Sequence, residues 1–366
     1  MLKVAHVTSA HPRQDIRIFR KECRTLAEHG YDVSLIVADG KGDECVDGVS
    51  IVDAGLLPGR LNRIFRTTRY VFEKALKINA DIYHLHDPEL LPIGLKLKKQ
   101  GKIVIFDSHE DVPRQLLSKP YLHPLFRRLI SAVFSVYERY VCSRLDGIVT
   151  ATPFIRDKFL AMNSVVLDVN NYPMIGELDA EVPWENKQNE VCYVGGIASI
   201  RGISEVIQSL SLIKSPVRLN LVGEFSESAV ETEVKQLAGW TSVNACGQLD
   251  RAEVREVLGR SIAGLVTFHP LPNHVDAQPN KMFEYMSSGI PVIASNFPLW
   301  RDLIEGSDCG VCVDPLNPQS IAEGIDFLIN NPERAKQMGC NGQHAVYTRY
   351  NWDVESKKLI EFYKKF

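Results

Sequence analysis

The chain has 366 residues, 45% of them hydrophobic and 24% charged, which is typical of a globular protein long enough for two domains. No apolar run approaches the roughly 20 residues of a membrane-spanning helix, the start predicts a strand rather than a signal peptide, and eight scattered cysteines predict free thiols in a reducing cytoplasm. Residues 1–170 carry 25 Lys and Arg against 20 Asp and Glu, and the remainder carries 17 against 25, so the amino-terminal half suits an anionic partner or a membrane face, while the excess is too small to indicate nucleic acid.

The amino-terminal half alternates apolar runs with amphipathic segments, which is the pattern of a parallel β-α-β sheet. The first helix follows the loop S-A-H-P-R-Q-D, has apolar residues at helical spacing from Ile16 to Leu26, and ends at Gly30. We predict strands at residues 2–8, 32–38, 45–54, 80–86, 102–107, 146–150 and 165–169, and helices at residues 57–78, 90–100, 114–139 and 153–160.

Two consecutive strands end in clusters of histidine and carboxylate. The sequence is H-L-H-D-P-E at residues 84–89 and D-S-H-E-D at residues 107–111. Because the carboxyl ends of parallel strands meet at one edge, where open α/β sheets bind ligands, the two clusters indicate a functional site. The alternative is a structural role for each histidine at its strand end.

Two basic amphipathic segments are candidate docking faces for anionic lipid or for a diphosphate-linked acceptor. In residues 57–78, four arginines recur at every third position among apolar residues. In residues 114–139, Arg127 and Arg128 lie inside an apolar run. The alternatives are a solvated helix face over the sheet for the first segment and a core helix for the second.

Residues 173–190 contain few apolar residues, several acids and Pro183, and predict a linker between two domains. A second α/β series begins with a strand at residues 191–194 that leads into G-G-I-A-S-I-R-G. Further strands are predicted at residues 218–222, near 243, and at 263–268, 291–294 and 310–313, with helices near 231–238 and at 253–260, 318–330, 332–347 and 352–366.

Residues 268–295 carry the most informative chemistry, with a polar loop after a strand and a helix that opens with P-N-K. A helix N-terminus attracts phosphate through its N–H groups and its dipole, and Lys281 in the first turn adds a cation. Glu284, one turn later, suits the hydroxyl groups of a ribose. Arg201 in the glycine-rich loop and Lys281 suit one diphosphate, so this stretch predicts a nucleotide-sugar site that needs no metal.

The whole chain resembles the retaining glycosyltransferases of family 4, which have the GT-B fold. The resemblance rests on two Rossmann-like halves, G-x-x-x-x-R-G early in the second half, a carboxylate pair eight residues apart before G-I-P-V-I-A, and the terminal W-D-V-E-S-K-K-L-I-E-F-Y. S-A-H-P-R-Q-D-I-R-I-F-R-K-E, H-D-P-E, D-S-H-E-D and P-N-K-M-F-E-Y-M are similar to a branch common in bacterial surface-polysaccharide assembly. The resemblance implies an acceptor-binding domain at residues 1–172 and a nucleotide-sugar-binding domain at residues 191–349. It also implies that a C-terminal helix at residues 350–366 crosses back to the first domain.

By this resemblance, Asp276 and Glu284 correspond to the Glu-x7-Glu motif of the family. Glu284 is then expected to hold the ribose, and Asp276, which is one methylene shorter than glutamate, is expected near the donor sugar. The family's Arg/Lys pair on the diphosphate maps onto Gly196 and Arg201, and we expect Lys281 to supply the missing cation. The expected donor-binding residues are Gly196, Arg201, Gly202, Gly223, Gln278, Asn280, Lys281 and Glu284.

His109 matches a histidine of the family that reaches toward the donor sugar and the reacting centre. The expected catalytic residues are therefore His109, Glu284 and Asp276. Asp15 and Arg17 are expected on the acceptor side, with a structural ion pair between them as the alternative. The expected acceptor-binding residues are His11, Asp15, Arg17, His86, Asp87, Glu89 and Glu110.

The sequence thus predicts a cytoplasmic enzyme that transfers a hexosyl or N-acetylhexosaminyl unit from a nucleoside diphosphate sugar, with UDP preferred over GDP. The predicted acceptor is either a saccharide or a lipid-linked saccharide, such as one on polyprenyl diphosphate at the inner face of the cytoplasmic membrane. The resemblance implies retention of configuration, and neither a cofactor nor a metal is expected. Two alternatives stay open: a nucleotide-sugar 2-epimerase with the GT-B fold, and a non-catalytic nucleotide-sugar-binding or scaffold protein. A dehydrogenase is disfavoured because the first β-α turn has no G-x-G-x-x-G.

Overall fold

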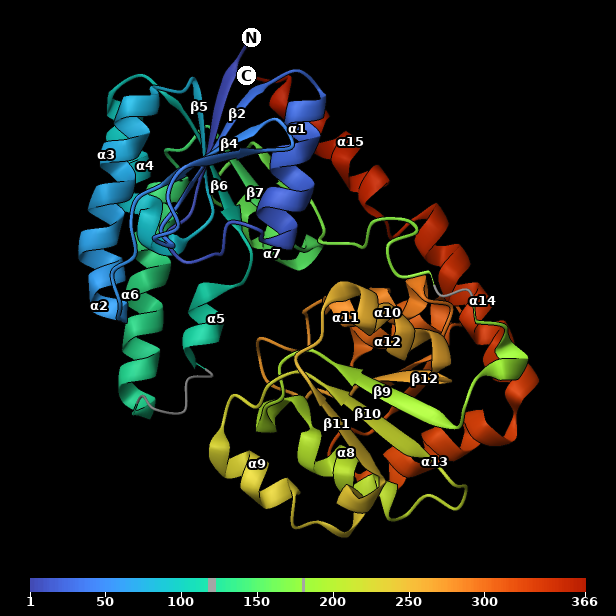
Figure 1. The fold of residues 1–366 in the computed structure, drawn as a ribbon. Coiled ribbons are helices and arrows are strands. Elements are labelled where there is room, and N and C mark those ends of the chain that lie inside the picture. Colours follow the sequence, from blue (N-terminus) through green and yellow to red (C-terminus); the bar gives the residue numbers. More distant parts are fainter. Residues whose placement is uncertain (118–122, 180–181) are drawn as a thin grey trace. The chain divides into compact units, whose positions relative to one another are not determined.

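The computed structural model describes residues 1–117, 123–179 and 182–366. The chain forms two compact units: an amino-terminal unit of Met1–Asn171 and Val354–Phe366, and a carboxy-terminal unit of Tyr172–Asp353. In each unit, helices cover both faces of a mostly parallel sheet (Figure 1). The predicted α/β class with two Rossmann-like halves is confirmed.

The amino-terminal sheet has the strand order β3-β4-β2-β1-β5-β6-β7-β8, in which β3 runs antiparallel to β4 and the other pairs are parallel. The segment 45–54, predicted as one strand, instead contributes to a hairpin. Asp47 (φ 49°) and Gly48 (φ 77°) both have the left-handed backbone that a tight two-residue turn requires. The strands are β1 (Lys3–Val7), β2 (Asp32–Val37), β3 (Glu44–Val46), β4 (Val49–Asp53), β5 (Ile82–Leu85), β6 (Ile103–Ser108), β7 (Gly147–Thr150) and β8 (Val166–Asp168).

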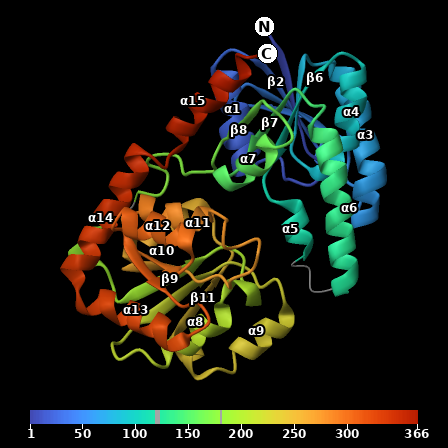
Figure 2. The ribbon, with the colours of Figure 1, turned by 180° about the vertical axis from the view of Figure 1, so that it is seen from behind.

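The alternation of side chains along each strand divides this unit into two layers of helices. Tyr83 and Leu85 belong to the hydrophobic core under α3, α4, α6 and α7, whereas His84 points to the opposite face, where α15 lies (Figures 1 and 2). The predicted helix 57–78 begins at Arg60, and the predicted segment 114–139 becomes two helices separated by residues that lie partly outside the described ones. The helices are η1 (Ile16–Cys23), α1 (Arg24–Glu28), α2 (Arg60–Asn62), η2 (Arg63–Thr67), α3 (Thr68–Ile78), η3 (Pro88–Leu90), α4 (Leu91–Lys99), α5 (Val112–Leu117), α6 (Pro124–Cys142) and α7 (Pro153–Leu160).

The C-terminal helix α15 (Trp352–Tyr363) packs on the amino-terminal unit, as the resemblance implied. A Cβ atom at Gly147 would lie 2.7 Å from the ring of Phe362, so the missing side chain of β7 makes room for this phenylalanine. Glu355 accepts a hydrogen bond from the backbone N–H of Asn170 (2.8 Å). Both contacts fasten α15 to the ends of neighbouring strands.

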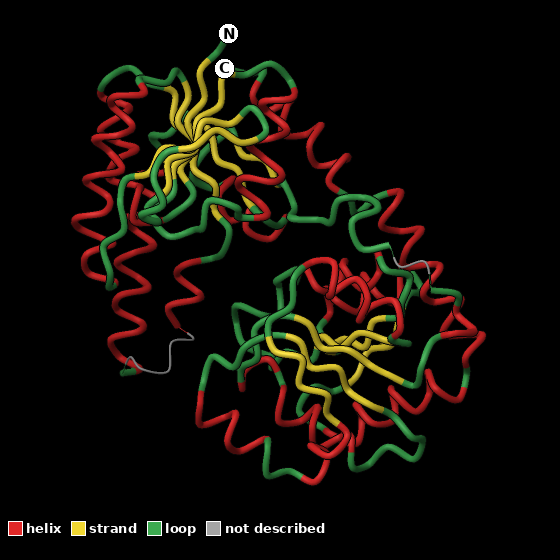
Figure 3. The backbone as a smooth tube through the Cα atoms, in the orientation of Figure 1, coloured by secondary structure: helices red, strands yellow, loops and turns green. Residues whose placement is uncertain are grey.

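The carboxy-terminal unit has a sheet of its own, drawn in yellow among red helices (Figure 3). This sheet is parallel throughout its described strands and has the order β11-β10-β9-β12-β13-β14. The three strands β9, β12 and β13 are buried along their whole length and mostly apolar, as expected for strands of a parallel sheet that is covered on both faces. The strands of this sheet are β9 (Glu190–Val194), β10 (Arg218–Val222), β11 (Val243–Gly247), β12 (Ala263–Val266), β13 (Val292–Ser295) and β14 (Gly310–Val313).

Two hydrophobic cores lie on the two faces of this sheet. Helices α8, α9 and α13 cover one face, and α10, α11 and α12 cover the other, while α14 contributes Ala335 and Met338 to the first core and Ala345 and Val346 to the second. Helix α12 is missing from the sequence prediction. The helices are η4 (Trp184–Asn186), η5 (Ser199–Arg201), α8 (Ile203–Leu210), α9 (Ser228–Val234), η6 (Ala238–Ser242), α10 (Arg251–Arg260), α11 (Asn280–Ser287), α12 (Pro298–Gly306), α13 (Pro318–Asn330) and α14 (Pro332–Thr348).

The start of the segment predicted as a linker packs against the carboxy-terminal unit. Leu178 is fully buried in the core of that unit, and the ring of Tyr172 lies 4.6 Å from the ring of Phe283. Residues 180–181 of this segment lie outside the described residues.

Each sheet has a point at which the strand order reverses. In the amino-terminal unit it lies between β1 and β5, and in the carboxy-terminal unit between β9 and β12. The loops that leave such a pair of strands turn to opposite sides and open a crevice, which is where open α/β sheets bind ligands. The predicted site residues follow these strands or their neighbours.

Gly264→Ala is expected to destabilise the carboxy-terminal unit. A Cβ at Gly264 would lie 2.3 Å from the ring of Tyr285, whose hydroxyl oxygen accepts a hydrogen bond from the N–H of Val194 (2.9 Å). The buried ring has to move, and we expect a loss of about 1–3 kcal/mol in the free energy of unfolding, measured by chemical denaturation.

The control is Gly306→Ala at the end of α12, where no described atom lies within 4 Å of the new Cβ. Alanine restricts the unfolded chain, so this variant is expected to be unchanged or slightly more stable. Equal unfolding free energies for the two variants would contradict the packing argument.

Candidate functional site

Close contacts between glycine loops build the crevice of the carboxy-terminal unit. A Cβ at Gly202 (φ 75°) would lie 2.0 Å from the backbone oxygen of Thr267, and a Cβ at Gly223 (φ 134°) would lie 2.1 Å from that of Gly195. The loop after β9 therefore touches the loops after β10 and β12 at positions that only glycine can occupy. Gly202 and Gly223, predicted as donor-binding residues, bring these loops together.

Lys281 lies in the first turn of α11, beside this crevice. Its Nζ is 3.6 Å from the ring centroid of Tyr193 and 5.6 Å from that of Phe268, and it has no hydrogen-bond partner among the described residues. Burial, and then the charge of Arg201, lower the pKa of Lys281 well below its usual range, although Glu284 acts in the opposite direction. A buried amine held only by aromatic faces is a ready partner for an anion.

Arg201 supplies a second cation at the same place. Its Nη1 donates to the backbone oxygen of Gly196 (2.9 Å), and its guanidinium lies 5.4 Å from the ring centroid of Phe268, the ring that Lys281 also faces. A Cβ at Gly196 would lie 2.9 Å from this guanidinium. The structure thus brings together Arg201, Lys281 and Gly196, as the sequence predicted for a diphosphate site.

Glu284 has a partner that the sequence prediction missed. Arg251 donates from Nη1 to Oε1 of Glu284 (2.8 Å) and from Nε and Nη2 to the two carboxylate oxygens of Glu177 (3.0 and 2.9 Å). The sequence predicts this helix from residue 253, whereas in the structure Asp250 caps it in a D-x-x-E capping box. That motif was visible in the sequence and places Arg251 at the first helical position.

The other predicted donor-side residues lie in or after the loop between β12 and α11. Asp276 is half-buried in this loop, and Asn280 is exposed at the first position of α11. The side-chain oxygen of Gln278 accepts a hydrogen bond from the hydroxyl of Tyr172 (3.0 Å). In this structure Gln278 therefore helps to hold the loop in place.

In the amino-terminal unit, Asp87 organises the loop after β1. Oδ2 accepts hydrogen bonds from the N–H of Ser9 (2.6 Å) and the hydroxyl of Thr8 (2.8 Å), and Oδ1 lies 3.0 Å from Nδ1 of His11. Burial raises the pKa of Asp87, but the hydrogen bond and charge of His11 outweigh it, so the pKa is lowered overall. Burial likewise opposes protonation of His11, yet the hydrogen bond that it donates to Asp87 raises its pKa. The raised pKa of His11 and the lowered pKa of Asp87 both favour an ion pair at the switch point.

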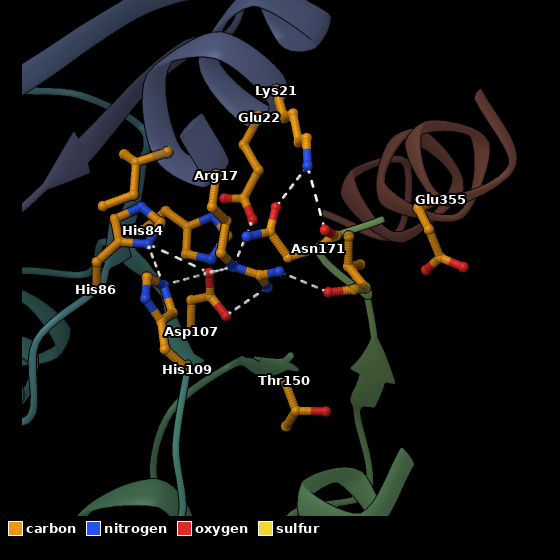
Figure 4. A network of polar contacts seen from close by, with 12 residues as sticks. Arg17, Lys21, Glu22, His84, His86, Asp107, His109, Thr150, Asn171 and Glu355 are labelled. Atoms are coloured by element: carbon orange, nitrogen blue, oxygen red, sulfur yellow. Dashed lines mark hydrogen bonds and ion pairs between the residues drawn. The ribbon is translucent and has the colours of Figure 1, made fainter. Parts of the chain in front are cut away.

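A second buried carboxylate, Asp107 at the end of β6, gathers several of the predicted residues (Figure 4). Nε and Nη2 of Arg17 donate to its two oxygens, both at 2.8 Å, and Nη1 donates to the backbone oxygen of Val169 (2.6 Å). Oδ2 also lies 3.0 Å from Nε2 of His109 and 3.2 Å from Nδ1 of His86. Of these side chains, that of His109 is 20% exposed, whereas those of Arg17 and His86 are buried.

The structural alternative of an Asp15–Arg17 ion pair is wrong in detail. Asp15 caps η1 and accepts hydrogen bonds from the backbone N–H groups of Arg17 and Ile18 (both 2.9 Å), while the Arg17 side chain turns inward to Asp107. A short polar side chain before a helix satisfies N–H groups that the helix cannot, which is the stronger demand.

The last two predicted residues lie at the rims of these loops. Oε1 of Glu89 forms an ion pair with Nε of Arg63 (2.7 Å) and accepts a hydrogen bond from the hydroxyl of Ser9 (3.2 Å). Glu110 is exposed and accepts a hydrogen bond from the side chain of Gln115. Glu110 therefore presents a carboxylate to solvent, next to His109 in the sequence.

In the described part of the chain, two overlapping groups of side chains are close enough to share a metal ion. They are His6, Glu22, His84 and His86, and His86, Asp107 and His109. Hydrogen bonds among the imidazoles already occupy several of these nitrogens, because Nδ1 of His6 lies only 2.8 Å from Nε2 of His86.

A long stripe of exposed apolar side chains lies along α6 in the amino-terminal unit. Its residues are 40–72% exposed, and Arg128 and Arg139 are exposed beside them. On η2, Phe65 is 71% exposed. No helix among the described residues is both long and apolar enough to cross a membrane. The α6 stripe comprises Leu125, Phe126, Leu129, Ile130, Val133, Val136 and Tyr140.

Lys281→Met is expected to stabilise the unliganded protein. Methionine fills a similar volume against the aromatic rings and removes a buried donor that has no partner, so we expect a gain of about 1–3 kcal/mol near neutral pH. The folded-state pKa of Lys281 lies below the unfolded value, so unfolding takes up a proton between the two values. The difference from wild type should therefore shrink as the pH rises toward about 10.4.

Denaturant unfolding at a series of pH values measures this difference. Lys235→Met, at an exposed lysine of the same unit, is the control and is expected to change stability by less than about 0.5 kcal/mol. A less stable Lys281→Met variant would show that the amine has partners in solution.

Comparison with known proteins identifies the family. The model of the Glycosyltransferase Family 4 domain matches residues 17–165, and that of the Glycosyl transferases group 1 domain matches residues 175–345. An uncharacterized glycosyltransferase of Methanocaldococcus jannaschii is 32% identical over 403 residues, which cover 99% of this chain and 98% of the relative.

Two solved structures have the same fold. Sucrose-phosphate synthase of Thermosynechococcus elongatus superposes with a TM-score of 0.81 at 16% identity and covers 100% of this chain and 99% of its own. HepE of Anabaena, in complex with UDP and glucose, has a TM-score of 0.77 at 14% identity and covers both chains completely. The chain therefore belongs to the group 1 and family 4 glycosyltransferases, which have the GT-B fold.

Proposed function

We propose that this glycosyltransferase moves a hexosyl or N-acetylhexosaminyl unit from a UDP-sugar to a saccharide acceptor, with retention of configuration and without a metal ion. The main support for binding of a nucleotide-sugar donor is the environment of Lys281. Its amine is buried at a helix N-terminus and has no hydrogen-bond partner in the described chain. A diphosphate would provide the missing acceptor oxygens and the compensating charge.

The leaving diphosphate gains negative charge as the bond to the sugar breaks. Arg201, Lys281 and the first N–H groups of α11 would stabilise this charge from fixed positions, without reorganisation during the reaction. These groups would take the place that a divalent cation has in other transferases. An activity that persists in excess EDTA is the expected result for this part of the proposal.

Glu284 would hold the nucleoside. Arg251 occupies its Oε1 and fixes the carboxylate in place, so that Oε2 is the oxygen we assign to the ribose hydroxyls. Asp276 would lie toward the sugar. UDP is preferred over GDP because a structural relative binds UDP and glucose, and retention is supported by the family to which the chain belongs.

On the acceptor side, exposure separates two kinds of predicted residues. His109, His11 and Glu110 are half-buried or exposed and suit contact with sugars. Arg17 and His86 are buried, and we propose that they support Asp107 and His109 instead of touching an acceptor. His109 is our candidate for the group nearest the transferred sugar.

The α6 stripe supports a lipid-linked acceptor. Amphipathic helices with exposed apolar residues and flanking arginines bind the interface of anionic membranes, where the apolar side chains enter the acyl boundary and the cations meet lipid phosphates. We propose that the α6 stripe docks on anionic lipid at the inner face of the cytoplasmic membrane, where polyprenyl-diphosphate-linked saccharides are reached.

Lys281→Ala is expected to weaken UDP binding by about 10–100-fold, as for the loss of a charge-assisted hydrogen bond, and UMP binding by much less. The reason is that the amine would contact the diphosphate and not the nucleoside. Glu284→Gln should weaken UDP and UMP equally, because both carry the ribose. Calorimetric titration of the three proteins measures this pattern.

Lys235→Ala is the matched control and should bind like wild type. Binding of UDP that is unchanged in Lys281→Ala would sink the donor assignment. Incubation with UDP-GlcNAc alone separates the alternatives: a 2-epimerase converts it without an acceptor, and a non-catalytic protein binds it without turnover and is unaffected by His109→Ala.

The double variant Val133→Asp and Val136→Asp is expected to lose at least about tenfold in binding to vesicles that contain phosphatidylglycerol, because two charges enter the apolar contact. Wild type should bind these vesicles more tightly than pure phosphatidylcholine and more weakly in high salt. Sedimentation with the vesicles measures the bound fraction.

The double variant Leu212→Asp and Leu316→Asp places the same two charges on apolar positions of the carboxy-terminal unit that are 43% and 53% exposed, and it should bind like wild type. The membrane proposal fails if wild type ignores anionic vesicles, or if the control loses binding to the same degree.

A further inference from the structure

The buried face of the amino-terminal sheet holds three histidines in a row. His6 on β1 is the register partner of His84 on β5, and His86 lies two residues further along on the same side. All three are at most 2% exposed, and their rings stack at centroid distances of 4.7–5.1 Å. The donor and acceptor roles proposed above make no direct use of His6 or His84.

These rings form a chain of hydrogen bonds that starts on the C-terminal helix. The hydroxyl of Tyr363 lies 2.7 Å from Nδ1 of His84 and 3.3 Å from Nε2 of His6. Nδ1 of His6 lies 2.8 Å from Nε2 of His86. Each contact joins two different elements, so the chain links α15 with β5 and β1.

The chain ends at the carboxylate that holds His109. Nδ1 of His86 lies 3.2 Å from Oδ2 of Asp107 and 3.3 Å from Nε2 of His109, which is 3.0 Å from the same oxygen (Figure 4). Arg17 pairs with both oxygens of Asp107 and keeps it ionised, so that Asp107 accepts hydrogen bonds and donates none.

Asp107 therefore sets the direction of every hydrogen bond in this row of side chains. Nδ1 of His86 has to carry the proton, and since a neutral imidazole has one N–H, Nε2 of His86 accepts from Nδ1–H of His6. By the same rule, Nε2 of His6 accepts from the hydroxyl of Tyr363, whose oxygen accepts from Nδ1–H of His84.

The rings are neutral, as this rule requires. Burial, and then the neighbouring histidines, lower the pKa of His6 and of His84 well below the usual range. Burial lowers the pKa of His86 to about 4, even though Asp107 opposes this. Glu22, 3.8 Å from Nδ1 of His6, has a pKa raised by burial and by Asp107.

The opposite direction is unfavourable. It would require Nδ1 of His86 to accept from His109 and to aim its lone pair at the Asp107 carboxylate 3.2 Å away. It would also leave Asp107 with one fewer donor, although a buried carboxylate needs its acceptor sites filled.

We propose that the hydroxyl of Tyr363 is a positioning group for His109: Asp107 sets the direction of the hydrogen bonds, and Tyr363, by accepting from His84 and donating to His6, holds the rings of His6 and His86 in place behind Asp107 and His109. The part that concerns turnover rests on the proposed transferase function. The part that concerns proton positions does not.

Tyr363→Phe removes this hydroxyl oxygen and keeps the aromatic ring with which α15 packs on the sheet. Nδ1–H of His84 and Nε2 of His6 then lose their partner, so the ring of His6 is no longer held from the side of α15 and can turn away from His86. We expect kcat to fall about tenfold through loss of His109 alignment, with a donor KM within about twofold of wild type.

The control is Tyr83→Phe in the same sheet. The hydroxyl of Tyr83 is also buried and also has two hydrogen-bond partners, the backbone oxygen of Ala75 (2.7 Å) and the N–H of Ala80 (2.9 Å), but it does not contact the histidine chain. It reports what the loss of a buried hydroxyl does through folding alone, and its kcat should match that of wild type.

Two-bond proton–nitrogen NMR spectra of histidine-labelled protein show which nitrogen of each ring carries the proton. Wild type and Tyr83→Phe should show Nδ1–H for His6, His84 and His86. Tyr363→Phe should show mixed tautomers for His6, whereas His86, which faces Asp107, should keep Nδ1–H. Protons on Nε2 in wild type, unchanged tautomers in Tyr363→Phe, or equal losses of kcat in both variants would overturn the proposal.

Metal analysis of the purified protein adds an independent check, because nitrogens that bind a metal cannot carry these protons. One equivalent of tightly bound metal lost on His6→Ala would overturn the proposal. If no nucleotide sugar is turned over by wild type while the tautomers behave as expected, the transferase function fails and the positioning chain stands.

Discussion

The buried ion pair of Arg17 and Asp107 holds the amino-terminal unit together at its functional edge. One guanidinium ties η1 to the end of β6 and, through the backbone oxygen of Val169, to the segment after β8. Two buried charges are tolerable only when each is matched by the other and by further hydrogen bonds. Every donor or acceptor that surrounds Asp107, His86 and His109 included, therefore has its position set by this pair.

Structural and ligand-binding cations in this protein differ in whether their N–H groups have acceptors in the fold. Arg17 is buried with each of its donor groups directed at an oxygen, so it has nothing left to offer a substrate. Lys281 is buried to a similar degree, yet among the described residues it has aromatic rings and no acceptor. The folded protein bears a cost at Lys281 that an anionic ligand would remove, which is how a binding site differs from a core.

The sequence predicted most of the fold because strands and helices follow local patterns. Residues 153–160 and 318–330 form helices with the predicted ends, each introduced by a proline and a polar cap. The sequence also predicted that Lys281, Arg201 and Gly196 lie close together, and they do, because the ends of parallel strands meet at a switch point whatever their side chains are. It missed Arg251 and the partners of Arg17, because those contacts span 33 to 152 residues and leave no periodic trace.

The histidines show that a sequence motif can indicate where a site lies without indicating what each of its side chains does. H-L-H-D-P-E and D-S-H-E-D look alike in sequence, but strand alternation sends His84, His86 and Asp107 to one buried face under η1 and α15. His109 has the same parity and lies one residue beyond β6, just as His86 lies one residue beyond β5, yet the side chain of His109 is 20% exposed and His86 is buried. The distance from the strand end therefore does not decide which of the two faces solvent. His86 is enclosed by His6 and Asp107, whose atoms lie 2.8 and 3.2 Å from its two ring nitrogens, and these long-range contacts leave no trace in the sequence.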